Sequence, residues 1–293
     1  MNAHAPRRRY RRVAMPGRRW PTRVFTYLSV AGSAALFLAP ILFMLVGSLK
    51  PDARVLAEAG GWHAFWPGSG ASGQNYADVF HRVSFLHYLF NSLWINGLIV
   101  VLGLPVNAFA GYALARLRWR GRELALAAVL AILVIPFEAI AVPLFYELTA
   151  LGMRDSYTVQ VIPFIANPLS IYLFYSFFLG LPRELEEAAR IDGAGVLRTF
   201  LTIVVPNAKA AFASVTIVTF LFYWGMYLWP LLVTGGPSVR PLPLGIATFY
   251  TLPPLQWGDI LAFGIMMVAP VLVVFVVFQR WFVRGVAATG LKG

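Results

Sequence analysis

The chain has 293 residues, of which 59% are hydrophobic and only 12% are charged. A soluble domain carries about twice that charged fraction, so the composition predicts an integral membrane protein. The net charge of +12 does not indicate nucleic-acid binding, because the arginines gather beside apolar runs and not on a folded basic domain. The absence of cysteine excludes disulfides, thiolate metal sites and cysteine nucleophiles.

The N-terminal segment 1–24 is strongly basic, and an apolar run over residues 25–49 follows it. The apolar core of a cleaved signal peptide has only about 7–15 residues, so this longer run is predicted to stay as a first spanning helix. Hydropathy predicts five further spans, at residues 87–114, 124–148, 158–179, 208–234 and 260–283. The expected fold is an all-α integral membrane protein with six transmembrane helices in a domain at residues 25–283.

Basic residues are distributed unevenly between the two sides of such a bundle. With the N-terminus in the cytoplasm, the inner segments hold most of the 24 lysines and arginines, and the outer segments keep only Lys50, Arg54, Arg82, Arg154 and Arg240. This bias predicts that both ends of the chain, including a C-terminal tail at 284–293, are cytoplasmic. It also places the polar segment between the fourth and fifth spans in the cytoplasm.

Several prolines fall inside the predicted spans: Pro105, Pro136, Pro143, Pro163, Pro168 and Pro270. Membrane helices tolerate such breaks where a neighbour or a water-lined cavity satisfies the freed carbonyls. Two interpretations stay open, namely kinks that serve packing and helices bent around a path that opens and closes.

The polar segment at 182–206 predicts a helix–turn–helix outside the bilayer. Its acids stand in early helical turns, where the helix dipole favours negative charge, and two alanines with minimal side chains follow them. Gly193 permits a sharp turn, and Asp192 is a suitable N-cap for the second element at 194–205, which has one apolar face and ends at Pro206. By its physics alone, this segment is either an interfacial connection or a helix that docks into a partner.

The stretch "EEAARIDGAG" closely resembles the EAA loop of ATP-binding-cassette importer permeases, whose core is E-A-A…D-G-A followed by a hydrophobic helix and a proline. The matching residues are Glu187, Ala188, Ala189, Asp192, Gly193, Ala194 and Pro206. The resemblance implies that this loop, at 182–206, forms coupling helices seated in a cleft of a cytoplasmic ATPase subunit. Many members carry a second proline four residues after the first, where this chain has Ala210.

The C-terminal "GVAATGLKG" is similar to the tail of the carbohydrate-uptake subfamily, to which the maltose system belongs. Gly290, Lys292 and Gly293 fit its G-x-K-G ending. The resemblance implies that the tail contacts the ATPase subunits, whereas its chemistry alone describes a flexible cationic end.

Glu138 is the only acid placed well inside a predicted span. An intramembrane ionisable residue is a candidate for the substrate path, and the alternative is a bond to a neighbouring helix end or to backbone freed by a proline. No arginine or lysine lies deep in a span, which favours a neutral solute, although a partner permease could supply a charge.

The aromatic run in the fifth span supplies the other path candidates, Tyr223, Trp224 and Tyr227. Aromatic faces with a polar tip suit sugar rings, and an interfacial belt or core packing is the competing interpretation. Trp229, which precedes a proline, fits an interfacial belt. The family usually places an asparagine and an acid after the tryptophan, where this chain has Gly225 and Met226.

Together, the resemblance implies a non-catalytic permease subunit of an ATP-driven importer for a sugar or related neutral solute, in the inner membrane of a bacterium. It implies no cofactor on this chain, and ATP-Mg on partner ATPases. The implied partners are a second homologous permease, two ATPase subunits, an extracytoplasmic solute-binding protein and membrane lipid, without nucleic acid. Glycerol-phosphate or a polyol is an alternative cargo. A secondary transporter and a membrane enzyme are weaker alternatives, because internal repeats and a catalytic constellation are not evident.

Overall fold

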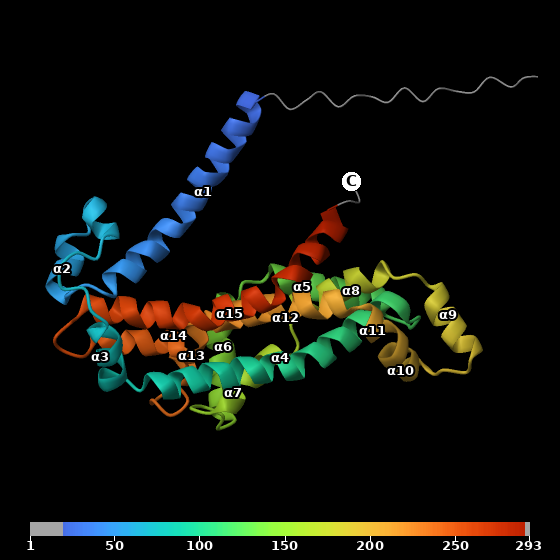
Figure 1. The fold of residues 1–293 in the computed structure, drawn as a ribbon. Helices are drawn as coiled ribbons and strands as arrows, with labels where there is room; N and C mark the ends of the chain where they lie inside the picture. Colours follow the sequence, from blue (N-terminus) through green and yellow to red (C-terminus); the bar gives the residue numbers. More distant parts are fainter. Residues whose placement is uncertain (1–19, 291–293) are drawn as a thin grey trace, which may run out of the picture.

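The computed structural model describes residues 20–290, and every regular element in that range is a helix (Figure 1). The all-α prediction is therefore confirmed for the described residues. The basic segment 1–19 lies outside them, and so do Lys292 and Gly293.

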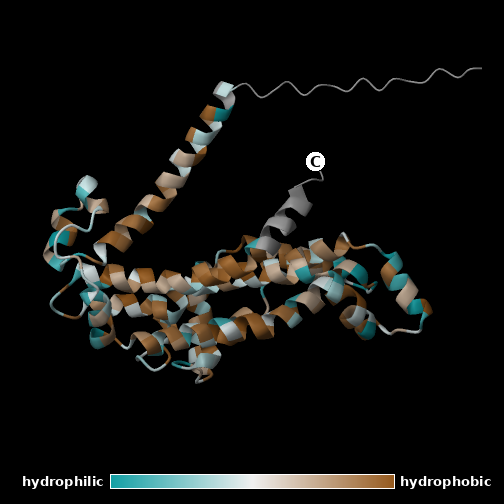
Figure 2. Ribbon diagram, in the orientation of Figure 1, coloured by the Kyte–Doolittle hydropathy of each residue, from teal (hydrophilic) through white to brown (hydrophobic). Residues whose placement is uncertain are grey.

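Four stretches are long and apolar enough to cross a membrane. They are α1 (Trp20–Gly47), α4 (Phe85–Arg116), the pair α7 (Tyr157–Ile165) and α8 (Pro168–Leu179), and α15 (Trp257–Gly290). Two bent pairs raise the number to six if each pair is one span. Apolar residues dominate these helices, whereas polar residues gather at the two ends of the bundle (Figure 2).

The remaining elements are shorter. On the chain between α1 and α4 lie α2 (Asp52–Ala57), η1 (Trp62–Phe65) and α3 (Gln74–Arg82). The middle of the chain contains α5 (Arg122–Val134), α6 (Phe137–Ala150), α9 (Glu184–Ile191), α10 (Val196–Thr199), η2 (Phe200–Val204) and α11 (Val205–Asn207). After these come α12 (Lys209–Trp224), α13 (Leu228–Val233), α14 (Leu242–Gly245) and η3 (Ile246–Tyr250).

The third predicted span is not one straight helix. It consists of α5 and α6, which meet at an angle of 100°. Ile135 and Pro136 between them have extended backbones, with ψ values of 118° and 140°. The proline ring disfavours the helical region for the residue before it, which fits the extended backbone of Ile135 at this break.

The fifth predicted span is also interrupted, because α12 ends at Trp224 and α13 begins only at Leu228. Pro230 has no N–H to donate to the carbonyl of Met226 four residues earlier, so a continuous helix would lack one hydrogen bond there. The prediction that Trp229 belongs to an interfacial belt is wrong. Its side chain is fully buried, and its indole N–H donates to the carbonyl of Val159 at 2.9 Å.

Helix α4 is the centre of the bundle, and its residues contribute to all three clusters of buried hydrophobic side chains. It packs most extensively against α8 and α7. A Cβ added at Gly111 would lie 2.7 Å from the Cβ of Phe174 on α8, and one added at Gly103 would lie 3.0 Å from the carbonyl oxygen of Ile165 on α7. Small residues on one face of a helix allow two helix backbones to approach this closely in a membrane.

Asn107 lies between these two glycines and holds the junction of α7 and α8 together. Its amide donates to the carbonyl of Ile165 at 3.0 Å and accepts from the backbone N–H of Asn167 at 2.9 Å. The side chain of Asn167 in turn caps α8 by accepting from the N–H of Ser170. The backbone groups freed at the break are thus satisfied without water, as an apolar medium requires.

At the opposite end of the bundle from α9, the segment before α4 is folded against α15 (Figure 1). Arg82 donates to the fully buried Asp259 at 2.6 Å and to the carbonyls of Leu252 and Pro254. The buried Lys50 donates to Glu58 at 2.9 Å, and this hydrogen bond lowers the pKa of the Glu58 carboxyl from its usual range. These bonds give the segment between α1 and α4 a defined structure.

We expect Gly111→Val to separate α4 from α8. The added side chain would overlap Phe174 and the backbone of Tyr175, so the unfolding free energy should fall by about 1–3 kcal/mol or more. Thermal unfolding of the detergent-purified protein measures the change. Gly97→Ala on the same helix is the matched control, because nothing lies within 4 Å of a Cβ there. Equal melting temperatures for the two variants would contradict the close-packing argument.

Candidate functional site

The segment at 182–206 begins with α9, which ends in a turn made by Gly193. The φ of Gly193 is +78°, a conformation that residues with a Cβ rarely adopt. Its N–H donates to the carbonyl of Arg190 at 3.0 Å, and the N–H of Ala194 donates to that of Ala189 at 2.9 Å. These two bonds form a Schellman motif, which closes the end of a helix and reverses the chain.

Asp192 does not cap the second element, contrary to the sequence prediction. It is the C-cap of α9, and its N–H donates to the carbonyl of Ala188. The N-cap of α10 is Gly195. The Schellman motif needs a residue before the left-handed glycine to finish the first helix, and Asp192 occupies that position.

The second element does not end at Pro206, so that prediction is wrong as well. The helical path runs from α10 through the π-helical turn η2 into α11, which contains Pro206. The break comes at Ala208, after which α12 leaves at an angle of 80°. A π turn shifts the hydrogen-bond register by one residue, which is a common way to accommodate an irregularity in a helix.

The predicted apolar face of this element is divided between two environments. Phe200 and Val204 are buried against α4 and α8, and the rings of Phe200 and Tyr112 lie 5.0 Å apart. Leu197 and Leu201, by contrast, are more than half exposed. One part of the face therefore attaches the loop to the bundle, and the other part is free.

Glu186 is a buried charged contact between α9 and α4, and sequence reasoning did not select it. Its side chain is buried, lies 3.3 Å from Nε of Arg116 at the end of α4, and accepts from the hydroxyl of Tyr112 at 3.1 Å. Arg116 also donates to the carbonyl of Leu181. The only signal in the sequence was an acid beside the matched Glu187, since the side of α9 that meets α4 is set by tertiary packing.

The matched residues on α9 point in two directions. Ala189 is buried, whereas Glu187 and Ala188 are exposed. Ile191, at the end of the same helix, is 86% exposed. An exposed helix end with an acid, a small residue and an unpaired apolar side chain is suited to protein contact.

A cavity of about 460 Å³ lies where the two helix breaks meet α12, and it opens to the outside of the chain, since Ile135 and Phe222 in its wall are 49% and 58% exposed. Its walls come from both sides of the α5–α6 bend and both sides of the α7–α8 break, and they include Ile135, Phe137, Pro163, Pro168, Thr219 and Phe222. The volume is in the range of small-molecule sites. This arrangement favours the second interpretation of Pro136 and Pro168, namely helices bent around a path.

The polar groups of this cavity are few and uncharged. Tyr223 accepts a hydrogen bond from Asn167 at 2.9 Å, and the hydroxyls of Ser170 and Thr219 lie 3.3 Å apart. None of the described residues that line the cavity is charged, and the described part of the chain has no group of three or more histidines or acids placed to hold a metal ion. The cavity is therefore suited to a neutral molecule with hydroxyl groups.

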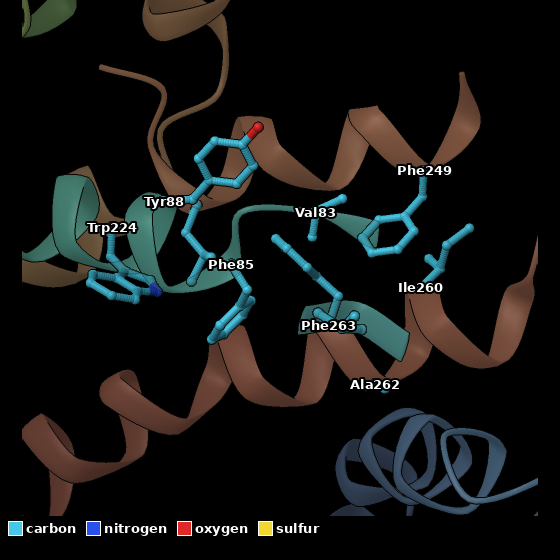
Figure 3. Close-up of a cluster of buried hydrophobic side chains, with 10 residues drawn as sticks. Val83, Phe85, Tyr88, Trp224, Phe249, Ile260, Ala262 and Phe263 are labelled. Atoms are coloured by element: carbon cyan, nitrogen blue, oxygen red, sulfur yellow. The ribbon is translucent and has the colours of Figure 1, made fainter. Parts of the chain in front are cut away.

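Of the predicted path residues, only Tyr223 lines this cavity. Trp224 is buried in the cluster between α4, α12 and α15, where its indole donates to the carbonyl of Met267 at 3.1 Å (Figure 3). Tyr227 is 41% exposed beyond the end of α12, so it no longer shares a helical face with Trp224. Glu138 is exposed in the first turn of α6.

The tail prediction falls mostly beyond the described residues. Helix α15 continues to Gly290, so the backbone at 284–290 is helical where chemistry alone suggested a flexible end. Lys292 and Gly293 lie outside the described residues.

The helical fold and the candidate spans define a multi-pass membrane protein. Residues 103–288 match the family described as "Binding-protein-dependent transport system inner membrane component". The chain belongs to this family, and it is a multi-pass protein of the inner membrane.

Relatives along almost the whole chain are permease subunits of transport systems. The arabinooligosaccharides transport system permease protein AraQ of Halalkalibacterium halodurans is 33% identical over 274 residues, which are 92% of this chain and 98% of the relative. The sn-glycerol-3-phosphate transport system permease protein UgpE of Yersinia enterocolitica is 37% identical over 199 residues, 67% of this chain and 71% of the relative. The sulfoquinovosyl glycerol transport system permease protein SmoH of Agrobacterium fabrum is 31% identical, over 87% and 89% of the two chains.

A solved structure has the same fold. It is a chain of a bacterial ABC transporter involved in the import of the acidic polysaccharide alginate, with a TM-score of 0.79 and 24% identity. The match covers 92% of this chain and 100% of that chain.

We expect Arg116→Met to destabilise the protein by about 3–5 kcal/mol, because it leaves the carboxylate of Glu186 buried without its partner. The double variant Arg116→Met/Glu186→Met should be less damaging than the single one, since it removes both charges. Thermal unfolding and the rate of proteolysis within 182–206 measure these effects. Arg120→Met, at an exposed arginine between α4 and α5, is the control and should leave both unchanged.

Proposed function

We propose that this chain is a permease subunit of an ATP-driven importer and that it carries a sugar or a related neutral solute. The observation that carries the proposal is the membership of the chain in the binding-protein-dependent family, together with the closed turn at Gly193 in the middle of its EAA-like loop. The relatives named for arabinooligosaccharides and sulfoquinovosyl glycerol support the choice of cargo.

In this proposal the chain crosses the membrane six times, with both ends in the cytoplasm. The pair α5–α6 serves as one span, and α12 with the helical path before it serves as another. The arginines concentrated at the ends of α4, α5 and α9 support this orientation, because cytoplasmic segments carry an excess of basic residues. The loop at 182–206 is then on the side where ATP is available.

The exposed side of α9 is the proposed contact with an ATPase subunit. Glu187, Ala188 and the turn at 192–194 would enter a cleft of that subunit, and the tail with Gly290, Lys292 and Gly293 would contact the ATPases as well. ATP with its Mg²⁺ would bind only to those partner subunits, so this chain is non-catalytic. Closure of two ATPases around ATP would displace α9, which is a two-state change biased by a ligand on a partner.

A displacement of α9 can be transmitted into the bundle through rigid, buried contacts. The buried pair of Glu186 and Arg116 joins α9 to α4, and the contact at Gly111 joins α4 to α8. Helix α8 begins at the break that borders the cavity. A movement of the loop would thus reach the cavity wall through buried contacts alone.

The cavity is the proposed part of the substrate path on this chain, with Tyr223 as the residue that meets the solute. Its uncharged lining favours a sugar or polyol over glycerol-phosphate, since a phosphate would require a cation. Glu138, Trp224 and Tyr227 are not assigned to the path, because they do not line the cavity. A second homologous permease would complete the path, and an extracytoplasmic solute-binding protein would deliver the solute.

The function is tested by reconstituting the chain with its neighbouring-gene permease, ATPase and binding protein in vesicles. Uptake of a labelled arabino-oligosaccharide, driven by ATP on the ATPase side, is the expected result. Uptake of glycerol 3-phosphate alone would contradict the neutral-cargo proposal. Uptake by this chain alone, driven by an ion gradient, would contradict the importer proposal.

We expect Gly193→Val to uncouple ATP hydrolysis from uptake while the subunits still assemble. The left-handed backbone at this position costs a residue with a Cβ about 1–2 kcal/mol, so the native turn should be populated roughly 5–30-fold less. Substrate-stimulated ATPase activity and uptake are measured together. Gly195→Ala is the matched control, because Gly195 has a φ of −70° and open space around a Cβ. Normal coupling in Gly193→Val would contradict the proposed role of the turn.

Tyr223→Phe is expected to raise the KM for uptake about three- to tenfold, since one hydrogen bond to the solute would be lost. The maximal ATPase rate should change little. Tyr227→Phe is the control, because Tyr227 does not line the cavity. The same KM for both variants would remove Tyr223 from the proposed path.

A further inference from the structure

A strongly basic hollow of about 330 Å³ lies beside α9, between the end of α4 and the start of α5. It is lined by the arginines Arg116, Arg118, Arg122, Arg183 and Arg190, together with two glutamates, Glu186 and Glu187. Glu186 is already paired with Arg116. Four arginines therefore face the hollow against one remaining acid.

The guanidinium groups of these four arginines have no hydrogen-bond or ion-pair partner among the described residues. Converging guanidinium groups repel one another unless an anion lies between them. The segments 1–24 and 284–293 contain no aspartate or glutamate, so no acidic side chain in them supplies that anion. An anionic group of another molecule would balance the charge that Glu187 leaves uncompensated.

The position of the hollow indicates which molecule. It lies where two membrane-spanning segments meet the surface, since α4 ends at Arg116 and α5 begins at Arg122. Trp119, in the turn between them, is 44% exposed, and Leu124 on the first turn of α5 is 78% exposed. Tryptophan beside exposed apolar residues marks the level of the lipid headgroups.

We propose that this hollow binds the phosphate of an anionic phospholipid in the adjacent leaflet. Guanidinium groups bind phosphate oxygens in pairs of parallel hydrogen bonds, and several arginines around one hollow satisfy more than one oxygen. The acyl chains of the lipid lie along the exposed face of α5. Basic hollows between spanning helices are known to hold such headgroups.

The site connects lipid composition to the loop at 182–206. Arg183 immediately precedes α9 and Arg190 lies in its last turn, whereas Arg118 and Arg122 belong to the connection of α4 and α5. A phosphate between them holds α9 against the membrane surface, in addition to the buried contact of Glu186. This consequence rests on the proposed function, but lipid binding itself does not.

The test is native mass spectrometry of the full chain, released with its co-purifying subunits from membranes or vesicles that contain phosphatidylglycerol and phosphatidylcholine. The wild type is expected to retain phosphatidylglycerol in preference to phosphatidylcholine. Arg118→Gln/Arg122→Gln should retain roughly 25-fold less, at about fivefold for each basic side chain removed. Arg118→Lys/Arg122→Lys should recover part of the binding, because the charge is restored without the paired geometry.

Arg120→Gln is the matched control, since Arg120 is exposed in the same turn but does not line the hollow. It should retain phosphatidylglycerol as the wild type does. Equal retention by Arg118→Gln/Arg122→Gln and the wild type would overturn the proposal. Loss of the ATPase subunits from that variant with unchanged lipid retention would also overturn it, by assigning the arginines to the ATPase. Complete displacement of the lipid by inorganic phosphate would identify a free-anion site instead.

Discussion

The close packing of α4 against the broken pair α7–α8 is the constraint on which the rest of the structure depends. Gly103 and Gly111 let the helix backbones approach so closely that there is no room for a Cβ at either position. Asn107, between them, hydrogen-bonds the backbone at the break. In a membrane, where apolar burial does not drive helices together, such contacts are a main source of cohesion. The break can exist in α7–α8 because α4 pairs its carbonyl and N–H groups, and the cavity can exist because of the break.

The same helix carries the polar loop at its other end. Arg116, which ends α4, forms a buried pair with Glu186, and Tyr112 one turn earlier donates to the same carboxylate. The desolvation of two charges offsets much of their attraction, so a pair of this kind contributes little net stability. Its effect is to fix one orientation of α9, since any other orientation leaves a charge unpaired. The loop is thus attached through Glu186, while Ala188 and Ile191 remain exposed.

Hydropathy and local turn chemistry predicted much of this architecture. The apolar runs predicted where the chain is long and apolar enough to span, and the glycine after "EEAARID" predicted the turn of the loop. Both succeed because burial in lipid and a positive φ depend on a residue and its immediate neighbours. The errors came where packing between distant segments decides. Trp229 looked interfacial but is buried against α7, and Trp224 looked like a path residue but packs between α12 and α15.

The sequence by itself determined that this protein lies in a membrane, where its apolar stretches are, and to which family its loop belongs. These properties depend on composition and on short contiguous patterns. Only the tertiary structure decided which side chains face one another. The choice of Glu186 over Glu187 as the buried acid, and of Tyr223 over Tyr227 as the cavity residue, follows from helix rotations set by contacts more than forty residues apart along the chain. In the apolar α12 such a rotation leaves no periodic signal, and in the polar α9 several acids stand side by side, so the pattern alone does not say which one is buried.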